Sequence, residues 1–160
     1  MEAMQEPALR RAPASAVERV YREQGDRMWR AVLAFSGDPD VASDAVAEAF
    51  AQALRRGDAL RDPGRWTWRA AFRIARGELK ARRHRPVPIR APHVEMPEPA
   101  VELVRALRQL PARQRAAVVL HHAADLPVRE VAAALGTSAA AARMSLTRGR
   151  RRLRELLKED

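Results

Sequence analysis

Five prolines fall within residues 86–99 and divide the chain into two parts. Each proline fixes its own φ angle, lacks an N–H donor and pushes the preceding residue away from helical geometry. A segment of this kind is extended and semi-rigid, at about 3.1 Å per residue, so it could span on the order of 40 Å. We therefore expect a Pro-rich linker at residues 86–99, a flexible N-terminus at 1–14, one domain at 15–85 and another at 100–160.

On both sides of the Pro-rich segment, apolar residues recur at helical spacing. Alanine is abundant and aromatic residues make up 4% of the chain, which also favours helices over strands. We find no strand candidate, so the expected fold class is all-α, with two small helical domains. The spacing predicts helices over residues 17–36, 39–56, 65–83, 101–110, 112–124, 127–135 and 139–158.

Local signals support the ends of several of these helices. Gly37, Gly57 and Gly136 are placed to end helices, because glycine readily takes the left-handed conformation. Asp38 and Ser138 are suited to cap the helices that follow them. The expected core is formed by the apolar faces of the helices and includes Val17, Tyr21, Met28, Phe50, Leu54, Trp68, Phe72, Leu146 and Leu157.

The charge of the chain points to a polyanionic partner, and charge alone does not choose between nucleic acid and an anionic membrane surface. Lysine and arginine number 30 against 20 acidic residues, a formal charge of +10, and neutralised phosphates release condensed counterions. The chain has no cysteine, which removes disulfides, thiolate chemistry and cysteine-based zinc sites and fits a cytoplasmic protein. No stretch is apolar enough for membrane insertion, and the first residues show no apolar core of a secretory signal.

The most informative local pattern is a helix-turn-helix over residues 128–143. Two short helices flank the turn at Gly136, and small alanines at the start of the second helix would let it enter a major groove. Arginine can pair with guanine through two hydrogen bonds, and threonine can touch a thymine methyl group or a phosphate. A plain helical hairpin with a solvated basic face remains the alternative. The candidate DNA contacts on the second helix are Arg143, Met144, Ser145, Thr147, Arg148, Arg150 and Arg151, with Arg152 and Arg154 as further phosphate contacts.

The helix predicted over residues 65–83 carries a second basic face beside two tryptophans. Basic residues next to aromatic rings suit single-stranded or opened DNA, on whose bases the rings can stack. Trp68 fits the core better, whereas for Trp66 a core position and a binding position are equally consistent with the pattern.

Signs of catalysis are absent from the sequence. His121 and His122 are adjacent, so on a helix they point about 100° apart and do not share a metal. Asp44 and Glu48 lie four residues apart, which suits a catalytic pair by spacing but fits a solvated or partner-binding face better. No nucleophile–base pair or Gly-rich phosphate loop is found. We therefore expect no enzyme activity, no cofactor, no metal site and no small-molecule substrate.

Three segments together resemble the extracytoplasmic-function group of bacterial RNA polymerase sigma factors. They are residues 106–115, which contain Leu-Pro followed by Arg115, residues 128–138, which contain the Glu130 helix and its glycine turn, and the basic residues 148–154. In the N-terminal part, Gly37-Asp38, residues 42–50 and residues 72–76 are similar to the polymerase-binding and promoter-melting helices of that family. The chain departs from the usual family residues at Ala47, at Ala70-Ala71, at Gly77 and at residues 140–142.

The resemblance implies a non-enzymatic subunit whose partners are core RNA polymerase, promoter DNA and, as a further candidate, an anti-sigma factor. The recognition helix of the helix-turn-helix would read the −35 element, and the loop at residues 58–66 with Trp66 would capture a flipped base of the −10 element. Strand opening would use Arg73, Arg76, Lys80 and Arg83. Polymerase binding would use Asp44, Ala47, Glu48 and Phe50.

Two other functions remain open. A stand-alone helix-turn-helix regulator would normally dimerise to match two half-sites, and the sequence shows no obvious dimerisation helix. A sigma-like interaction module would bind polymerase or a regulator without initiating transcription, and the departures at Ala47, Ala70 and Gly77 motivate that alternative.

Overall fold

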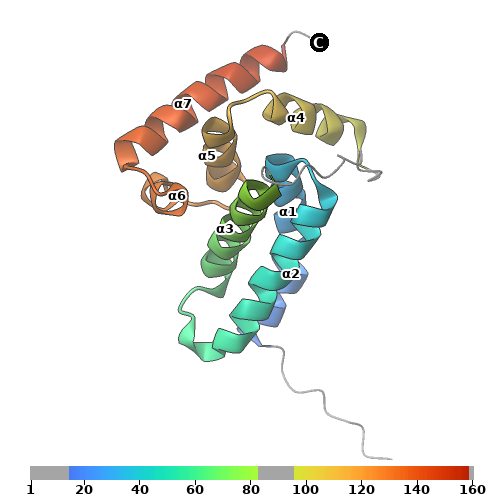
Figure 1. Ribbon diagram of the computed structural model, residues 1–160, viewed down its shortest axis with the longest axis vertical. Helices are drawn as coiled ribbons and strands as arrows, with labels where there is room; N and C mark the ends of the chain where they lie inside the picture. Colours follow the sequence, from blue (N-terminus) through green and yellow to red (C-terminus); the bar gives the residue numbers. More distant parts are fainter. Residues whose placement is uncertain (1–14, 83–95, 159–160) are drawn as a thin grey trace, which may run out of the picture.

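The computed structural model describes residues 15–82 and 96–158, and every regular element in these two ranges is a helix (Figure 1). The all-α fold class is thereby confirmed. The first range contains α1 (Ala16–Ser36), α2 (Pro39–Arg56), the 3-10 turn η1 (Gly57–Ala59) and α3 (Pro63–Arg82). The second range contains α4 (Glu98–Arg108), α5 (Ala112–His122), α6 (Val128–Leu135) and α7 (Ala139–Leu156).

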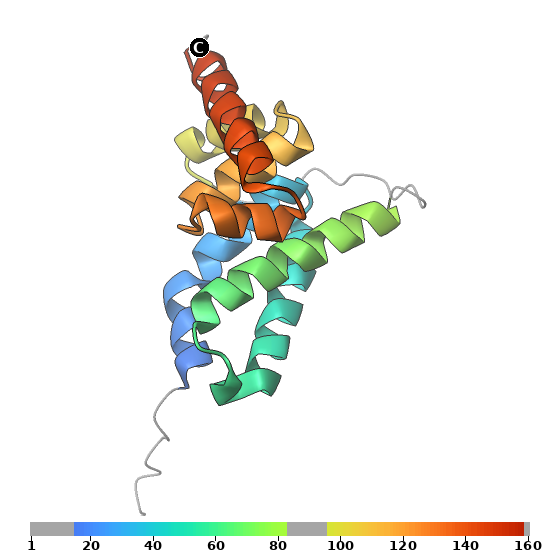
Figure 2. The ribbon, with the colours of Figure 1, turned by 90° about the vertical axis from the view of Figure 1, so that its left-hand side faces the viewer.

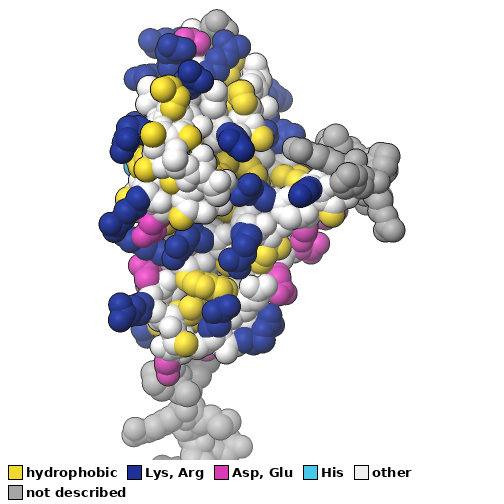
Figure 3. Space-filling view, turned by 60° about the vertical axis from the view of Figure 1, so that its left-hand side comes forward, with side chains coloured by type: hydrophobic (Ala, Val, Ile, Leu, Met, Phe, Trp, Pro, Cys, Tyr) yellow, Lys and Arg dark blue, Asp and Glu magenta, His cyan; other side chains and the backbone are white. Residues whose placement is uncertain are grey.

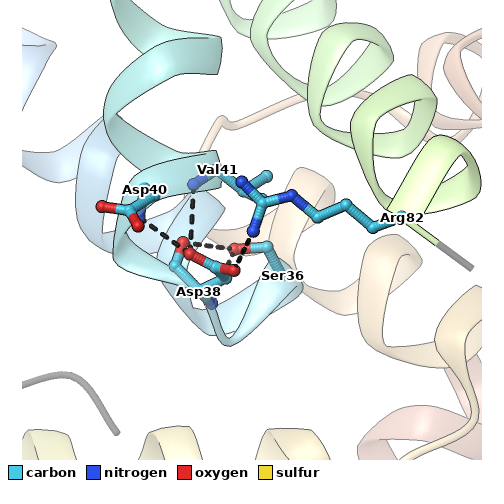
Figure 4. Close-up of polar contacts among 5 residues, drawn as sticks. All are labelled: Ser36, Asp38, Asp40, Val41 and Arg82. Atoms are coloured by element: carbon cyan, nitrogen blue, oxygen red, sulfur yellow. Dashed lines mark hydrogen bonds and ion pairs between the residues drawn. The ribbon is translucent and has the colours of Figure 1, made fainter. Parts of the chain in front are cut away.

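The helix starts follow from capping groups. The Ser15 hydroxyl accepts a hydrogen bond from the Glu18 amide (3.2 Å), and one Asp38 carboxylate oxygen accepts from the amides of Asp40 (2.8 Å) and Val41 (3.3 Å). These bonds satisfy N–H groups that have no partner inside a helix. Arg82 reaches from the end of α3 to the other oxygen of Asp38, so this cap also ties α3 to α2 (Figure 4).

Two predicted helix starts were too late. α3 begins at Pro63 and not at residue 65, and α4 begins at Glu98, so the last two residues of the predicted linker are helical. Proline is tolerated in the first turn of a helix, where its missing N–H has no role. Asp62 supports the earlier start of α3, because its carboxylate accepts a hydrogen bond from the Arg65 amide (3.0 Å). Of the predicted linker, residues 86–95 lie outside the described residues, as does the predicted N-terminal segment 1–14.

The first three helices form one packed unit, and the C-terminal helices lie across one end of it (Figures 1 and 2). α1 contacts both α4 and α5, and α3 contacts α6, so buried residues of both units belong to one continuous core. The sequence alone does not show whether the two parts pack together. In the structure they do.

Three residues predicted in the core are exposed, with exposed fractions of 60% for Tyr21, 54% for Leu54 and 43% for Leu157. Tyr21 lies at the edge of the packed face of α1 and covers Phe50, with ring centroids 5.0 Å apart and the rings nearly perpendicular. Leu157 follows Leu156, the last residue of α7. The other predicted core residues are buried, and Trp68, Phe72 and Met28 are among the largest.

Candidate nucleic-acid interface

The helix-turn-helix is formed by α6, a short turn and α7. Gly136 takes the left-handed conformation, with φ 63° and ψ 39°, and the Thr137 amide donates back to the Ala132 carbonyl (3.0 Å). This arrangement satisfies carbonyl groups at the end of α6 and redirects the chain. The Ser138 hydroxyl then accepts a hydrogen bond from the Ala141 amide (3.1 Å), which starts α7. The turn therefore has the geometry that its sequence predicts.

One face of α7 packs against α5 and α6 through Ala142, Leu146 and Gly149. A Cβ atom at Gly149 would lie 2.8 Å from Val118 Cγ2, so the absence of a side chain allows α5 and α7 to approach closely. The opposite face of α7 points to solvent. It presents five of the predicted DNA contacts as exposed side chains, namely Arg143, Met144, Thr147, Arg148 and Arg151, while Ser145 at its border is half-buried.

Arg150 departs from this exposed face. Its Nε donates a hydrogen bond to Nε2 of His122 on α5 (3.0 Å), and the side chain is half-buried. Burial and then the charge of Arg150 lower the pKa of His122 below its ordinary value of 6.5. The neutral imidazole is the form that can accept this hydrogen bond. Arg150 therefore joins α7 to α5 in this arrangement.

Three of the four predicted strand-opening residues lie on α3. Arg73, Arg76 and Lys80 are exposed, and Arg83 lies outside the described residues. Trp66 is half-buried with the Arg56 guanidinium 5.0 Å from its ring centroid, a cation–π contact that covers one face of the indole. Trp68 is a core residue whose Nε1 donates to Oε1 of Gln24 (2.8 Å).

Two contacts join α3 to α6 across the interface between the domains. Arg65 Nη1 lies 2.9 Å from Oε1 of Glu130, and Arg76 Nη1 donates to the Ala134 carbonyl (2.9 Å). Arg76 is thus already engaged by the helix-turn-helix domain. Arg65 was not among the predicted site residues, and no local signal points to it, because its partner Glu130 lies 65 positions away.

The predicted polymerase-binding residues lie on α2, where Asp44, Ala47 and Glu48 form an exposed row. A hydrogen bond from Gln52 and the charge of Arg55 hold the pKa of Glu48 below its ordinary value, so this carboxylate stays ionised. Phe50 does not share the exposed row. Its side chain is 5% exposed and packs in the core, because it lies on the inward face of α2 beside Ala49 and Ala53.

On the face drawn in Figure 3, basic side chains extend from the C-terminal domain at the top to the N-terminal domain below, and acidic side chains are fewer.

Within residues 15–82 and 96–158, no group of three or more histidine, cysteine, aspartate or glutamate side chains could hold a metal ion. None of the helices in those ranges is both long and apolar enough to cross a lipid bilayer.

These features define a two-domain helical protein whose C-terminal domain is a basic helix-turn-helix. Residues 100–153 match the family model described as Sigma-70, region 4. No curated protein matches the sequence. The resemblance to RNA polymerase sigma factors is thereby confirmed in the domain whose motifs carry it best.

Solved structures extend the likeness to the fold of nearly the whole chain. The sigma factor RpoE, in complex with the anti-sigma factor NepR from Bartonella quintana, has a TM-score of 0.65 at 21% identity, over 89% of this chain and 96% of that one. CnrH, in complex with the cytosolic domain of CnrY, has a TM-score of 0.63 at 22% identity, over 90% of this chain and 88% of that one. The fold is therefore that of a sigma factor with both of its helical domains.

Proposed function

We propose that this chain is a sigma factor of the extracytoplasmic-function group, which binds core RNA polymerase and directs initiation at promoters with its own −35 and −10 elements. The polymerase would form the phosphodiester bonds, so the chain itself would be a non-enzymatic subunit that needs no cofactor. The observation that carries this proposal is the exposed basic face of α7 in a Sigma-70 region 4 domain.

The surface of α7 suits readout of a DNA duplex. Arg143 and Arg148 are exposed on successive turns of the helix with Thr147 beside them, and Arg151 continues the row toward the C-terminus. Arginine reads guanine through two hydrogen bonds, and further arginines neutralise phosphates. We propose that the exposed members of the predicted set contact the −35 element. Arg150 is instead hydrogen-bonded to His122 in this arrangement.

The N-terminal domain suits the other two tasks of a sigma factor. We propose that the exposed row of Asp44, Ala47 and Glu48 binds the polymerase, and that the ring of Phe50 supports this row from inside. For the −10 element we propose Trp66 with Arg73, Arg76 and Lys80 of α3, together with Arg83, which lies outside the described residues. In the arrangement described here Arg56 covers Trp66 and Ala134 engages Arg76, so both contacts would have to be released on promoter binding.

Transcription with purified core polymerase tests the proposal. We expect run-off transcripts from a subset of a promoter library only when the chain is added, and mapped start sites should share two sequence elements. A variant with Arg143→Ala and Arg148→Ala should lose promoter selection while it still binds core polymerase in gel filtration. A free dimer on a palindromic site would favour a stand-alone regulator, and polymerase binding without any transcript would favour an interaction module.

We propose an anti-sigma factor as a further partner. A largely apolar groove of about 790 Å³ lies between α1 and the C-terminal helices, and four arginines border it: Arg27, Arg30, Arg150 and Arg154. Leu103 in this groove is 41% exposed. An amphipathic acidic helix is the kind of segment that such a groove fits. The complexes of RpoE with NepR and of CnrH with CnrY motivate this assignment.

A photo-crosslinking amino acid in place of Leu103 tests this partner in growing cells. The protein that it captures should, once purified, suppress run-off transcription, and Leu103→Asp should restore transcription in its presence. A captured protein that leaves transcription unchanged would contradict the assignment of the groove.

A further inference from the structure

A second cavity, of about 970 Å³, lies between the two domains on the side of α3. One wall comes from the turn between α1 and α2 and from the second half of α3, and the other comes from α4, α5 and the end of α6. Its volume is in the range of small-molecule sites, which is about 300–1,000 Å³. Because residues of both domains line it, the cavity exists only when the domains are packed together.

Both walls of this cavity are positively charged. The wall from α3 carries Arg76, Lys80 and Arg82, and the facing wall carries Arg108, Arg113 and Arg115. Asp38 is the acidic residue that lines the cavity, and its carboxylate is already occupied by Arg82 and by the cap of α2. Like charges that face each other across a confined space repel. The packed arrangement therefore brings together charges that favour an anion between them.

The two walls approach closely at Gly37. This residue has φ +70°, and a Cβ atom there would lie 1.7 Å from Nη1 of Arg108. The guanidinium of Arg108 thus occupies the space that a side chain at residue 37 would need. Glycine at this position both allows the left-handed turn and admits a cation from the other domain.

Arg115 is a half-buried cation of the set. Its Nε is buried and has no hydrogen-bond partner among the described residues. Burial, and then the nearby charge of Arg108, lower the pKa of Arg115. A buried N–H donor without a partner is costly. Arg115 also lines the cavity, so its positive charge lies within reach of an anion there.

The first turn of α5 adds backbone donors on the same side. α5 begins after Pro111, which supplies no side-chain cap, and Ala112 and Arg113 of its first turn line the cavity. The first amides of a helix have no internal partner, and the helix dipole favours negative charge there. Phe35, Leu79 and Leu135 contribute apolar surface to the rest of the lining.

We propose that this interdomain cavity binds a small pyrophosphate-bearing molecule of the nucleoside diphosphate class, which joins the two domains. The pyrophosphate would lie between the α3 cations and Arg108, Arg113 and Arg115, and the nucleoside would contact the apolar lining. The volume is that of a small-molecule site, and cations of both domains line it, so one compact anion can contact both walls at once. This binding does not depend on the proposed function in transcription.

Calorimetric titration of the full chain with pyrophosphate and with ADP, at constant ionic strength, tests the proposal. We expect saturable binding with a stoichiometry of one, with ADP tighter than pyrophosphate. The double variant Lys80→Ala, Arg113→Ala should bind at least about tenfold more weakly, because charge-assisted hydrogen bonds are lost. Arg105→Ala removes an exposed cation of α4 outside the cavity and is the matched control, with binding unchanged.

A distance measurement shows whether the anion joins the domains. The chain has no cysteine, so Ala47→Cys on α2 and Ala140→Cys on α7 can carry a donor and an acceptor dye. Pyrophosphate should raise energy transfer in this labelled protein but not in its Lys80→Ala, Arg113→Ala form. The proposal is overturned if both anions bind the double variant and the parent equally, if neither binds, or if only a duplex oligonucleotide shows binding that depends on Lys80 and Arg113.

Discussion

At Gly149, α7 has room for a hydrogen atom and nothing larger. A Cβ atom there would lie 2.8 Å from Val118 Cγ2 and 3.1 Å from the Gln114 carbonyl oxygen. Valine is stiff at χ1 and the backbone oxygen cannot move alone, so Gly149→Ala should force α5 and α7 apart. We expect a loss of about 1–3 kcal/mol in the free energy of unfolding, although alanine is the better helix former.

Gly77→Ala is the matched control in urea denaturation. Gly77 lies within α3, and no atom within 4 Å would meet its added Cβ. This substitution should stabilise the chain by about 0.5–1 kcal/mol. If Gly149→Ala stabilised the chain as much as Gly77→Ala, the result would contradict the claim that a side chain at residue 149 forces α5 and α7 apart.

Arg148 and Arg151 are both exposed on α7 and should differ in what they contribute to DNA binding. If Arg148 reads a base, Arg148→Ala should weaken binding to the −35 duplex by about 1–3 kcal/mol and relax the preference at one position. Arg151→Ala should weaken binding to all sequences and reduce the salt dependence, because a phosphate contact releases counterions. Binding titrations on specific and random duplexes at several salt concentrations separate the two effects, and an unchanged preference in Arg148→Ala would exclude base contact.

The contact between α5 and α7 has a predicted pH dependence through His122. Its pKa is below 6.5 in the folded chain, and its other charged neighbours are His121 and Asp125. As the pH falls through about 6.5, the unfolded chain therefore binds this proton before the folded chain does, and the free energy of unfolding decreases. Urea denaturation between about pH 7.5 and pH 5.5 should show a shallower loss of stability in His122→Gln than in the parent chain. Equal slopes would show that His122 titrates alike in both states.

Ser138 caps the start of α7, the proposed recognition helix. The Ser138 hydroxyl accepts from the Ala141 amide, and the side chain lies at the end of α7 that would enter the major groove. Ser138→Ala should lower the free energy of unfolding by about 0.5–2 kcal/mol, since one amide loses its partner. Ser138→Asp preserves a cap and should restore stability, but its negative charge should weaken DNA binding. Thermal unfolding and duplex titration report the two effects, and full stability in Ser138→Ala would mean that the cap has no role.

The elements that the sequence predicted best are those with a signal at both ends. α2 has the predicted bounds because Asp38 and Pro39 begin it and Gly57 ends it. The starts of α3 and α4 were missed because proline breaks a periodic pattern even where it begins a helix. Arg150 was assigned to the DNA-binding face because spacing alone does not show that Gly149 lets α5 approach. Contacts such as Arg65 with Glu130 join positions that no local pattern relates.

The packing of the two domains is a property of the whole molecule. Polar contacts at the edge of the interface between the domains can change the ratio of packed to separated domains. Arg65 and Glu130 are 2.9 Å apart, with side chains 45% and 17% exposed. An ion pair of this exposure contributes about 0.2–1 kcal/mol. Arg65→Ala should therefore lower the ratio of packed to separated domains by up to about fivefold, and the effect should shrink as salt screens the pair.

Energy transfer between dyes at Ala47→Cys and Ala140→Cys measures that ratio. Arg65→Ala and Glu130→Gln should lower the transfer to similar extents, and the double variant should lower it by no more than either one, because both remove the same pair. Asp62→Asn is the control, since Asp62 pairs with Arg65 within the N-terminal domain (3.4 Å). Equal transfer in all variants would mean that the apolar contacts of α1 with α4 and α5 alone hold the domains together. Lower transfer would instead mean that release of Arg65 from Glu130 favours separation of the domains, which would free Arg76 from α6 for DNA.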